Sequence, residues 1–205
     1  MRHLLATLLL ILALPTWAAG KLTIAAAADL KFAMDEIVAA FKQAHPGATV
    51  EVIYGSSGKF HAQVRQGAPY DLFFSADIAY PQMLAKEGLA GSEVRPYAFG
   101  RIVLWSKSRD AGRMKLADLA DPSIRKIAIA NPRHAPYGKR AEEALRAAGI
   151  WDRVQSRLVM GENVAQAAHY VQSGNADIGI IALALALNKE LAAMGNHALI
   201  DDRLH

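Results

Sequence analysis

Short apolar runs that suit strands alternate with segments of helical periodicity along almost the whole chain, and this alternation is what most restricts the fold. The runs 22–26 and 49–54 are each followed by such a helical segment, and the first helical segment stops at His45-Pro46-Gly47. Strands that alternate with helices pair in parallel, with right-handed crossovers that place helices on both faces of the sheet. The pattern therefore predicts an α/β fold with mostly parallel sheets and helices on both faces.

The same alternation continues to the C-terminal half and predicts two lobes. Further strands are expected at 71–76, 101–106, 126–130 and 177–181, and further helices at 81–86, 139–148 and 164–172. We place the crossing between lobes at the stretch 96–100, which contains Pro96 and Gly100. Residues 19–98 are then expected to form lobe 1 and residues 99–198 lobe 2, with a ligand cleft between them.

The first 18 residues have the pattern of a secretory signal peptide. Arg2 precedes an apolar run over 4–14, which ends at Pro15 and the small-residue pattern Thr16-Trp17-Ala18. The run has the length of a signal h-region, about 7–15 residues, and is shorter than the roughly 20 residues that span a bilayer. We expect cleavage after Ala18 and a soluble protein in a bacterial periplasm; an uncleaved anchor is the alternative.

Composition excludes several classes of function. The chain has no cysteine, so a disulfide, a thiolate nucleophile or a thiolate metal site is impossible. Its formal net charge is +4, which becomes +3 once Arg2 is removed, and no basic run of the nucleic-acid-binding type is present. A mild attraction for anions is all that this charge indicates.

Loops at the carboxyl ends of strands are where α/β folds bind ligands, and four of them carry suitable residues. They are the loops 27–29, 55–59, 131–138 and 161–164. In the second, the Gly55-Ser56-Ser57-Gly58 turn offers the free N–H groups of a helix start together with two hydroxyls, which suits an anion. It is not a P-loop, because Phe60 replaces the Ser or Thr that would hold magnesium. It is not a nucleophile elbow either, because Lys59 occupies the position of the closing glycine. A plain N-cap turn is the alternative.

Other candidate residues near these loops each have an ordinary alternative. Asp29 would repel an anion unless it caps its own helix or carries a proton, and the helix cap is the simpler interpretation. Tyr137 could donate its hydroxyl or only pack on its loop. His134 and His169 lack the partners that a metal site needs, and we interpret them as ordinary surface or loop residues. Trp105 and Trp151 are expected to pack in the interior. No metal cation site is expected.

Four sequence segments together carry a resemblance to a known family. They are Ile24-Ala25-Ala26-Ala27-Ala28-Asp29-Leu30, Tyr54-Gly55-Ser56-Ser57-Gly58, the run from Gly67-Ala68-Pro69 to Ala76-Asp77, and Asn131-Pro132-Arg133-His134-Ala135-Pro136-Tyr137-Gly138. In this order they resemble the periplasmic molybdate-binding proteins of ABC importers, over essentially the whole chain after residue 18. The resemblance implies a two-lobed periplasmic binding protein of type II that closes on its ligand without catalytic turnover.

The resemblance also implies a set of ligand-binding residues. Matching motif to motif places Asp29 and Ser57 on lobe 1, and Tyr137 and the backbone N–H of Val164 on lobe 2. A tyrosine that the family commonly uses is replaced here by Ala182, for which Tyr137 is a substitute. Many relatives carry Ser, Thr or Asn where Asp29 stands. A strand and a helix beyond residues 199–202 are expected to complete lobe 1, so that the chain looks shortened.

The resulting expectation is a monomeric solute-binding protein that captures molybdate or tungstate, needs no cofactor and delivers its ligand to a membrane permease. One alternative keeps the fold but changes the ligand to sulfate, phosphate, chromate or an organic acid. Asp29 favours this alternative, because a carboxylate can accept the proton of a phosphate. The other alternative is an exported serine hydrolase that uses Ser56 or Ser57.

Overall fold

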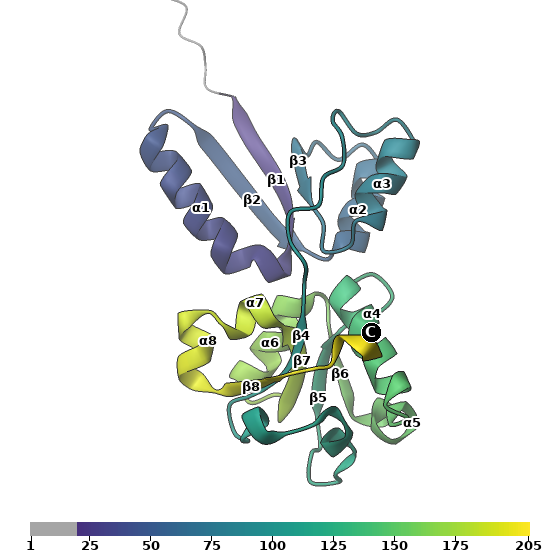
Figure 1. Ribbon diagram of the computed structural model, residues 1–205. Coiled ribbons are helices and arrows are strands. Elements are labelled where there is room, and N and C mark those ends of the chain that lie inside the picture. Colours follow the sequence, from purple (N-terminus) through teal and green to yellow (C-terminus); the bar gives the residue numbers. More distant parts are fainter. Residues whose placement is uncertain (1–19) are drawn as a thin grey trace, which may run out of the picture.

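The strands of the protein form two separate sheets, one in each of two lobes (Figure 1). The computed structural model describes residues 20–205, so the predicted signal peptide lies outside the described part of the chain. Within residues 20–205 a single segment, between Lys86 and Ile102, joins the lobes. No helix in this range has both the length and the apolar composition needed to cross a bilayer.

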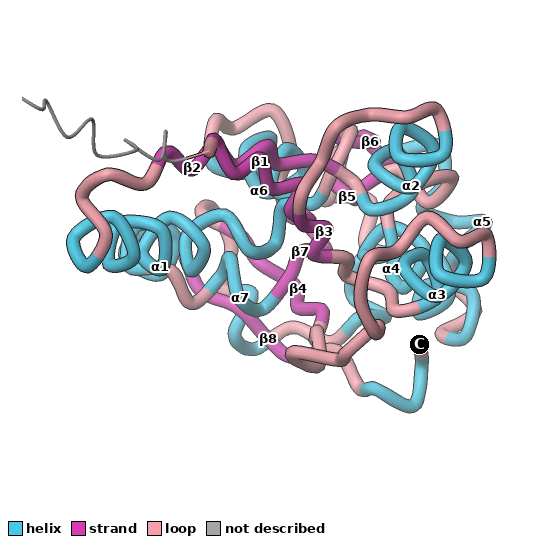
Figure 2. The backbone as a smooth tube through the Cα atoms, turned by 90° about the horizontal axis from the view of Figure 1, so that it is seen from above, coloured by secondary structure: helices cyan, strands magenta, loops and turns pink. Residues whose placement is uncertain are grey.

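Lobe 1 contains a parallel sheet in which β1 (Lys21–Ala27) lies between β2 (Thr49–Gly55) and β3 (Leu72–Phe74). Its helices are α1 (Lys31–Ala44), α2 (Ser57–Arg65) and α3 (Ala79–Lys86). Because the chain crosses in opposite directions from β1 to β2 and from β2 to β3, α1 and α2 lie on opposite sides of the sheet, and α3 packs beside α2 (Figure 2).

Lobe 2 contains a mixed sheet of five strands in the order β6-β5-β7-β4-β8. Strands β5 (Ile127–Ala130), β6 (Leu158–Gly161) and β7 (Ile178–Ala182) are parallel, whereas β4 (Ile102–Ser106) runs antiparallel to β7 and to β8 (Asn196–Leu199). The helices of this lobe are α4 (Pro136–Ala147), α5 (Trp151–Val154), α6 (Val164–Gln172), α7 (Leu183–Ala186) and α8 (Lys189–Met194).

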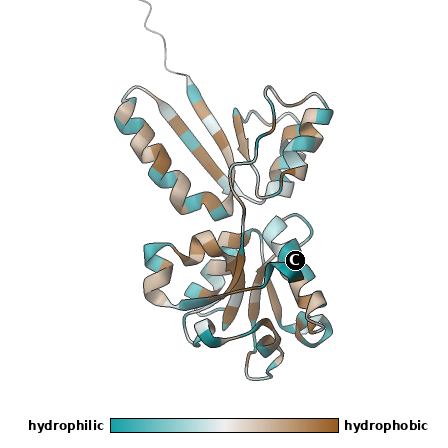
Figure 3. Cartoon of the chain, viewed as in Figure 1, coloured by the Kyte–Doolittle hydropathy of each residue, from teal (hydrophilic) through white to brown (hydrophobic). Residues whose placement is uncertain are grey.

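The predicted fold class is confirmed: the molecule is an α/β protein with two lobes and mostly parallel sheets. Strands β4, β5 and β7 are buried along their whole length, as continuous apolar runs predict, and they appear hydrophobic in Figure 3. Trp105 is fully buried in β4, and Trp151 is partly buried beneath the Arg146 guanidinium. Strands β6 and β8 were not predicted.

The residues that follow β8 lie against lobe 2. The Ile200 N–H donates to the Ile102 carbonyl at 3.1 Å, and Leu204 packs against the core of lobe 2. The strand and helix expected to complete lobe 1 are not among residues 20–205. A hydrophobic core cluster of lobe 1 is formed by Ile24, Ala26 and Val50.

Candidate anion-binding site between the lobes

Four junctions between a strand and the following helix meet where the two lobes touch. Two belong to lobe 1, at the ends of β1 and β2, and two belong to lobe 2, at the ends of β5 and β6. Together with Ala76, which follows β3, they enclose a cavity of about 10 Å³, which is room for about one water molecule. The cavity is lined by Ala27, Ala28, Asp29, Gly55, Ser56, Ser57, Ala76, Ala135, Pro136, Tyr137, Asn163 and Val164.

All four predicted site residues, Asp29, Ser57, Tyr137 and Val164, line this one cavity. Asp29 lies in the short 3-10 turn that follows β1. Ser57 and Val164 are the first residues of α2 and α6, and Tyr137 is the second residue of α4. Backbone N–H groups in the first turn of a helix have no hydrogen-bond partner within that helix, so they can donate to an anion. The structure thus brings together residues that are up to 135 positions apart (Asp29 to Val164), although their contact with a ligand stays a prediction.

The Ser57 side chain is completely buried and forms one hydrogen bond, to a residue of the same lobe. Its Oγ accepts from the Ala76 N–H at 3.0 Å, so the hydroxyl hydrogen stays available for a ligand. Ser56 occupies the N-cap position of α2, but neither serine side chain caps the helix. The plain N-cap alternative is therefore not what the structure shows.

Asp29 is a buried carboxyl with one satisfied oxygen. The Tyr137 hydroxyl donates to Asp29 Oδ2 at 3.1 Å across the lobe interface, and Asp29 Oδ1 has no hydrogen-bond partner. Burial raises the pKa of Asp29 to about 6, although the hydrogen bonds from Tyr137 and from its own backbone lower it. Burial and the neighbouring Asp29 also raise the pKa of Tyr137, so this hydroxyl keeps its proton. Asp29 does not cap a helix with its side chain.

The lining residues of the cavity include no lysine or arginine. Lys31 and Lys59, each two positions from a lining residue, form ion pairs with Asp35 and with Glu162 of lobe 2. An anion in this cavity would therefore be held by backbone N–H groups and neutral hydroxyls, whose positions are fixed by four helix starts.

A second set of contacts, which we call the interlobe contact, joins α2 to the loops before α4 and α6. The Gly58 N–H donates to the His134 carbonyl at 2.9 Å, and Ser56 Oγ lies 2.9 Å from His134 Nδ1. Lys59 and Glu162 form the ion pair, and Glu162 Oε1 is 3.8 Å from His134 Nε2. A methyl group on Gly58 would come within 2.6 Å of the His134 carbonyl oxygen, so this close approach requires glycine.

His134 lies in a loop, as expected, but it also takes part in the interlobe contact, which the sequence did not predict. The signal that could have identified it is its place in the same Pro132-to-Pro136 loop that delivers Tyr137. His169 is exposed on α6, as expected.

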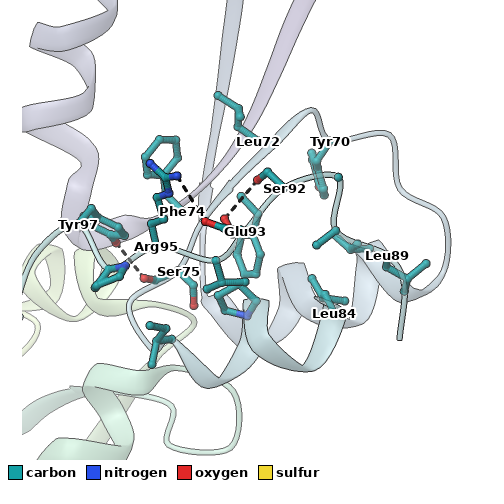
Figure 4. Close-up of a pocket in the computed structure, with 18 of the residues that line it drawn as sticks. Tyr70, Leu72, Phe74, Ser75, Leu84, Leu89, Ser92, Glu93, Arg95 and Tyr97 are labelled. Carbon is teal, nitrogen blue, oxygen red and sulfur yellow. Dashed lines mark hydrogen bonds and ion pairs between the residues drawn. The ribbon is translucent and has the colours of Figure 1, made fainter. Parts of the chain in front are cut away.

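A larger cavity, about 730 Å³, lies elsewhere, within lobe 1 between β3, α3 and the segment that leads to lobe 2 (Figure 4). Its polar groups bind one another: the Tyr97 hydroxyl donates to the Ser75 carbonyl at 2.9 Å, and Arg95 pairs with Glu93. Leu72, Leu84 and Leu89 supply much of its apolar lining. None of the four predicted residues lines this groove, and it does not gather donors from both lobes.

The profile of bacterial extracellular solute-binding proteins matches residues 22–205, nearly the whole described chain. The chain belongs to this family. Its curated relatives include the molybdate-binding protein ModA of Rhodobacter capsulatus, 38% identical over 185 residues, and that of Azotobacter vinelandii, 36% identical over 167 residues. These alignments cover 87% and 80% of this chain but 70% and 66% of the relatives, so the solute-binding protein described here matches about two thirds of their length.

Solved structures agree with the fold of this solute-binding protein. The periplasmic molybdate-binding protein of Azotobacter vinelandii superposes with a TM-score of 0.82 at 34% identity, covering 90% of this chain and 80% of that one. The sulfate-binding protein SubI of Mycobacterium tuberculosis superposes with a TM-score of 0.70 at 19% identity, covering 88% of this chain and 71% of that one, and shows the fold alone. The resemblance noted from the motifs is thereby confirmed, and the two relatives named above are molybdate-binding proteins.

Proposed function

We propose that this protein captures molybdate or tungstate in the periplasm, as a monomer without a cofactor, and delivers it to the membrane permease of an ABC importer. The observation that carries the proposal is the cavity in which hydroxyls and helix-start N–H groups of both lobes converge. The molybdate-binding relatives at 36–38% identity support the choice of ligand.

The energetics of such a site do not require a charged side chain. A dianion leaves water only if fixed donors replace most of the hydrogen bonds that it loses. Each hydrogen bond to a charged group contributes about 1.5–3 kcal/mol, so half a dozen contribute roughly 9–18 kcal/mol before the costs of closure. Micromolar to nanomolar binding needs about 8–12 kcal/mol. Rigid donors would then discriminate by oxygen spacing against the smaller sulfate ion.

Thermal unfolding in the presence of four anions tests the ligand. We expect molybdate and tungstate to raise Tm, by an amount equivalent to about 4 kcal/mol at a thousandfold excess over Kd, because they bind only the folded state. Sulfate and phosphate should leave Tm nearly unchanged. Stabilisation by phosphate alone would show that the ligand is wrong while the binding fold stands.

Replacing Ser57 with alanine tests the donors. The Ser57→Ala variant should bind molybdate about tenfold or more weakly, because a donor to a charged ligand is worth about 1.5–3 kcal/mol. Ser92→Ala, an exposed serine of the same lobe, is the matched control and should bind as the parent protein does. Calorimetric titration of both variants provides the comparison. Unchanged affinity in Ser57→Ala would remove the serine from the site.

A serine hydrolase is a second candidate, because Ser56 Oγ lies 2.9 Å from His134 Nδ1. It ranks lower for two reasons. The third member of such a triad, Glu162, is 3.8 Å from the imidazole, beyond hydrogen-bond length, and is already paired with Lys59. Turnover of a generic ester that is lost in Ser56→Ala would establish this candidate.

A further inference from the structure

We infer that the site binds its fully ionised oxyanion together with one proton, which is carried by the Asp29 carboxyl. This inference rests on the proposed function and adds to it the protonation state in which the site accepts its ligand. It makes Asp29 the residue that couples affinity to pH.

One oxygen of the buried Asp29 carboxyl has no hydrogen-bond partner. The residue is only 8% exposed and lines the cavity, and its Oδ1 has no partner while Oδ2 accepts the Tyr137 hydroxyl. A buried carboxylate oxygen without a donor is costly, and a proton on Oδ1 turns this oxygen into a donor. A donor is what a bound oxyanion needs at this position.

The groups that face Asp29 do not offset a negative charge. The titratable side chains around it are Tyr137 of α4 and Tyr97 of the segment that joins the lobes, and burial raises the pKa of both, so both stay neutral. Arg101 lines a neighbouring pocket with Asp29, but its guanidinium pairs with Asp202. Among residues 20–205, the one side-chain hydrogen bond to Asp29 comes from Tyr137.

An ionised Asp29 beside a dianion would be strongly unfavourable. Both groups offer only acceptors, and two unit charges about 4 Å apart repel by about 4 kcal/mol at an effective dielectric constant near 20. With the proton on Oδ1, the carboxyl donates to a ligand oxygen and no bond within the ligand changes. The proton comes from solvent, and the pKa of about 6 in the protein makes this uptake inexpensive near neutral pH.

Titration calorimetry of the unaltered protein with molybdate tests the inference without any variant. Between about pH 6.5 and 8.5 the ligand stays fully ionised, and Kd should rise close to a hundredfold, because the fraction of protonated Asp29 falls about tenfold per pH unit above its pKa. Measurements in buffers of different ionisation enthalpy should show nearly one proton taken up per anion near the upper pH. A flat Kd without proton uptake would overturn the inference and leave molybdate binding intact.

The Asp29→Asn variant tests the same inference by removing the titrating carboxyl. Its amide can accept from Tyr137 and donate to the ligand at every pH, so its Kd should vary less than about threefold over the same range and be lower than that of the parent protein near pH 8.5. Asp35→Asn removes a carboxyl that is exposed and bonded to Tyr54 and Lys31 in the same lobe, and should keep the steep profile of the parent.

The remaining outcomes separate the inference from the proposed function. If neither the parent protein nor Asp29→Asn binds molybdate or tungstate at any pH, the proposed function itself fails. If phosphate binds the parent tightly and Asp29→Asn loses it, the ligand supplies the proton and an ionised Asp29 accepts it, which overturns the inference.

Discussion

Two kinds of residue surround the cavity between the lobes. Val164, at the start of α6, offers a backbone N–H group, whereas Asp29, Ser57 and Tyr137 offer side-chain groups. The backbone donors could be anticipated from the sequence, because helix starts after parallel strands always present them. The hydrogen bond between Asp29 and Tyr137 could not, since it forms only when the lobes meet.

The buried Asp29 carboxyl should make the ligand-free protein less stable as pH rises. Its pKa is about 6 in the folded protein and near 3.8 when unfolded, so the folded state binds more protons between these values and stability falls with rising pH. Above about pH 6, Asp29→Asn should therefore be more stable than the parent by up to about 3 kcal/mol. Urea unfolding of both proteins from pH 4 to pH 7 measures the difference.

Asp35→Asn is the control of opposite sign for this prediction. Hydrogen bonds from Tyr54 and Lys31 outweigh desolvation and lower the pKa of Asp35, so this carboxylate stabilises the fold above its unfolded pKa. Its replacement should lower stability at neutral pH. A stability difference for Asp29→Asn that does not change with pH would contradict the raised pKa.

Among the elements, α2 connects the site to the lobe interface. Ser57 at its start lines the cavity, while Ser56, Gly58 and Lys59 contact His134 and Glu162 of lobe 2. The ion pair is half exposed and contributes at most about 1 kcal/mol. The close backbone approach at Gly58 is consequently the element of this contact that a substitution would affect most.

Gly58→Ala should hold the lobes apart. The added methyl group meets a backbone oxygen, which cannot move aside, so α2 must retreat from the loop before α4. We expect anion affinity to fall at least tenfold, with a smaller effect on thermal stability. Gly47→Ala, where the added methyl meets no atom within 4 Å, is the matched control. Equal affinity of the two variants would show that the site does not need this close contact.

In lobe 2 the sequence predicted the central strands better than the edge strands, whereas in lobe 1 it predicted all three strands. Strands β1, β5 and β7 are flanked on both sides and have continuous apolar runs, so periodicity identifies them. The edge strands β6 and β8 contain exposed residues such as Met160 and Leu199, and their pattern does not differ from that of a loop. The antiparallel pairing of β4 depends on which strands become neighbours, which local pattern does not encode.

For the molecule as a whole, the narrow cavity implies that the lobes must separate to admit a ligand. A tetrahedral oxyanion exceeds a volume of about 10 Å³, so the loops have to move apart and close again around it. The single segment that joins the lobes within residues 20–205 leaves this movement free.

Fluorescence energy transfer can follow the movement, because the chain has no native cysteine to interfere with labelling. Labels on cysteines placed at Lys42 of α1 and Lys189 of α8, both exposed and on different lobes, should come closer when molybdate is added. The same labels on the Gly58→Ala protein should stay farther apart. A distance that is identical with and without ligand would show that the lobes do not move.

A pocket whose backbone donors are the main-chain amides of helix starts is resistant to mutation in a particular way. Exchanging one of its alanines alters how wide it is, yet cannot delete a donor, because every residue except proline brings an amide hydrogen. The choice of anion can then change through substitutions at very few positions, chiefly Asp29 and Tyr137, while the fold of both lobes stays the same. Homologues with different cargoes would be expected to differ first at these two places.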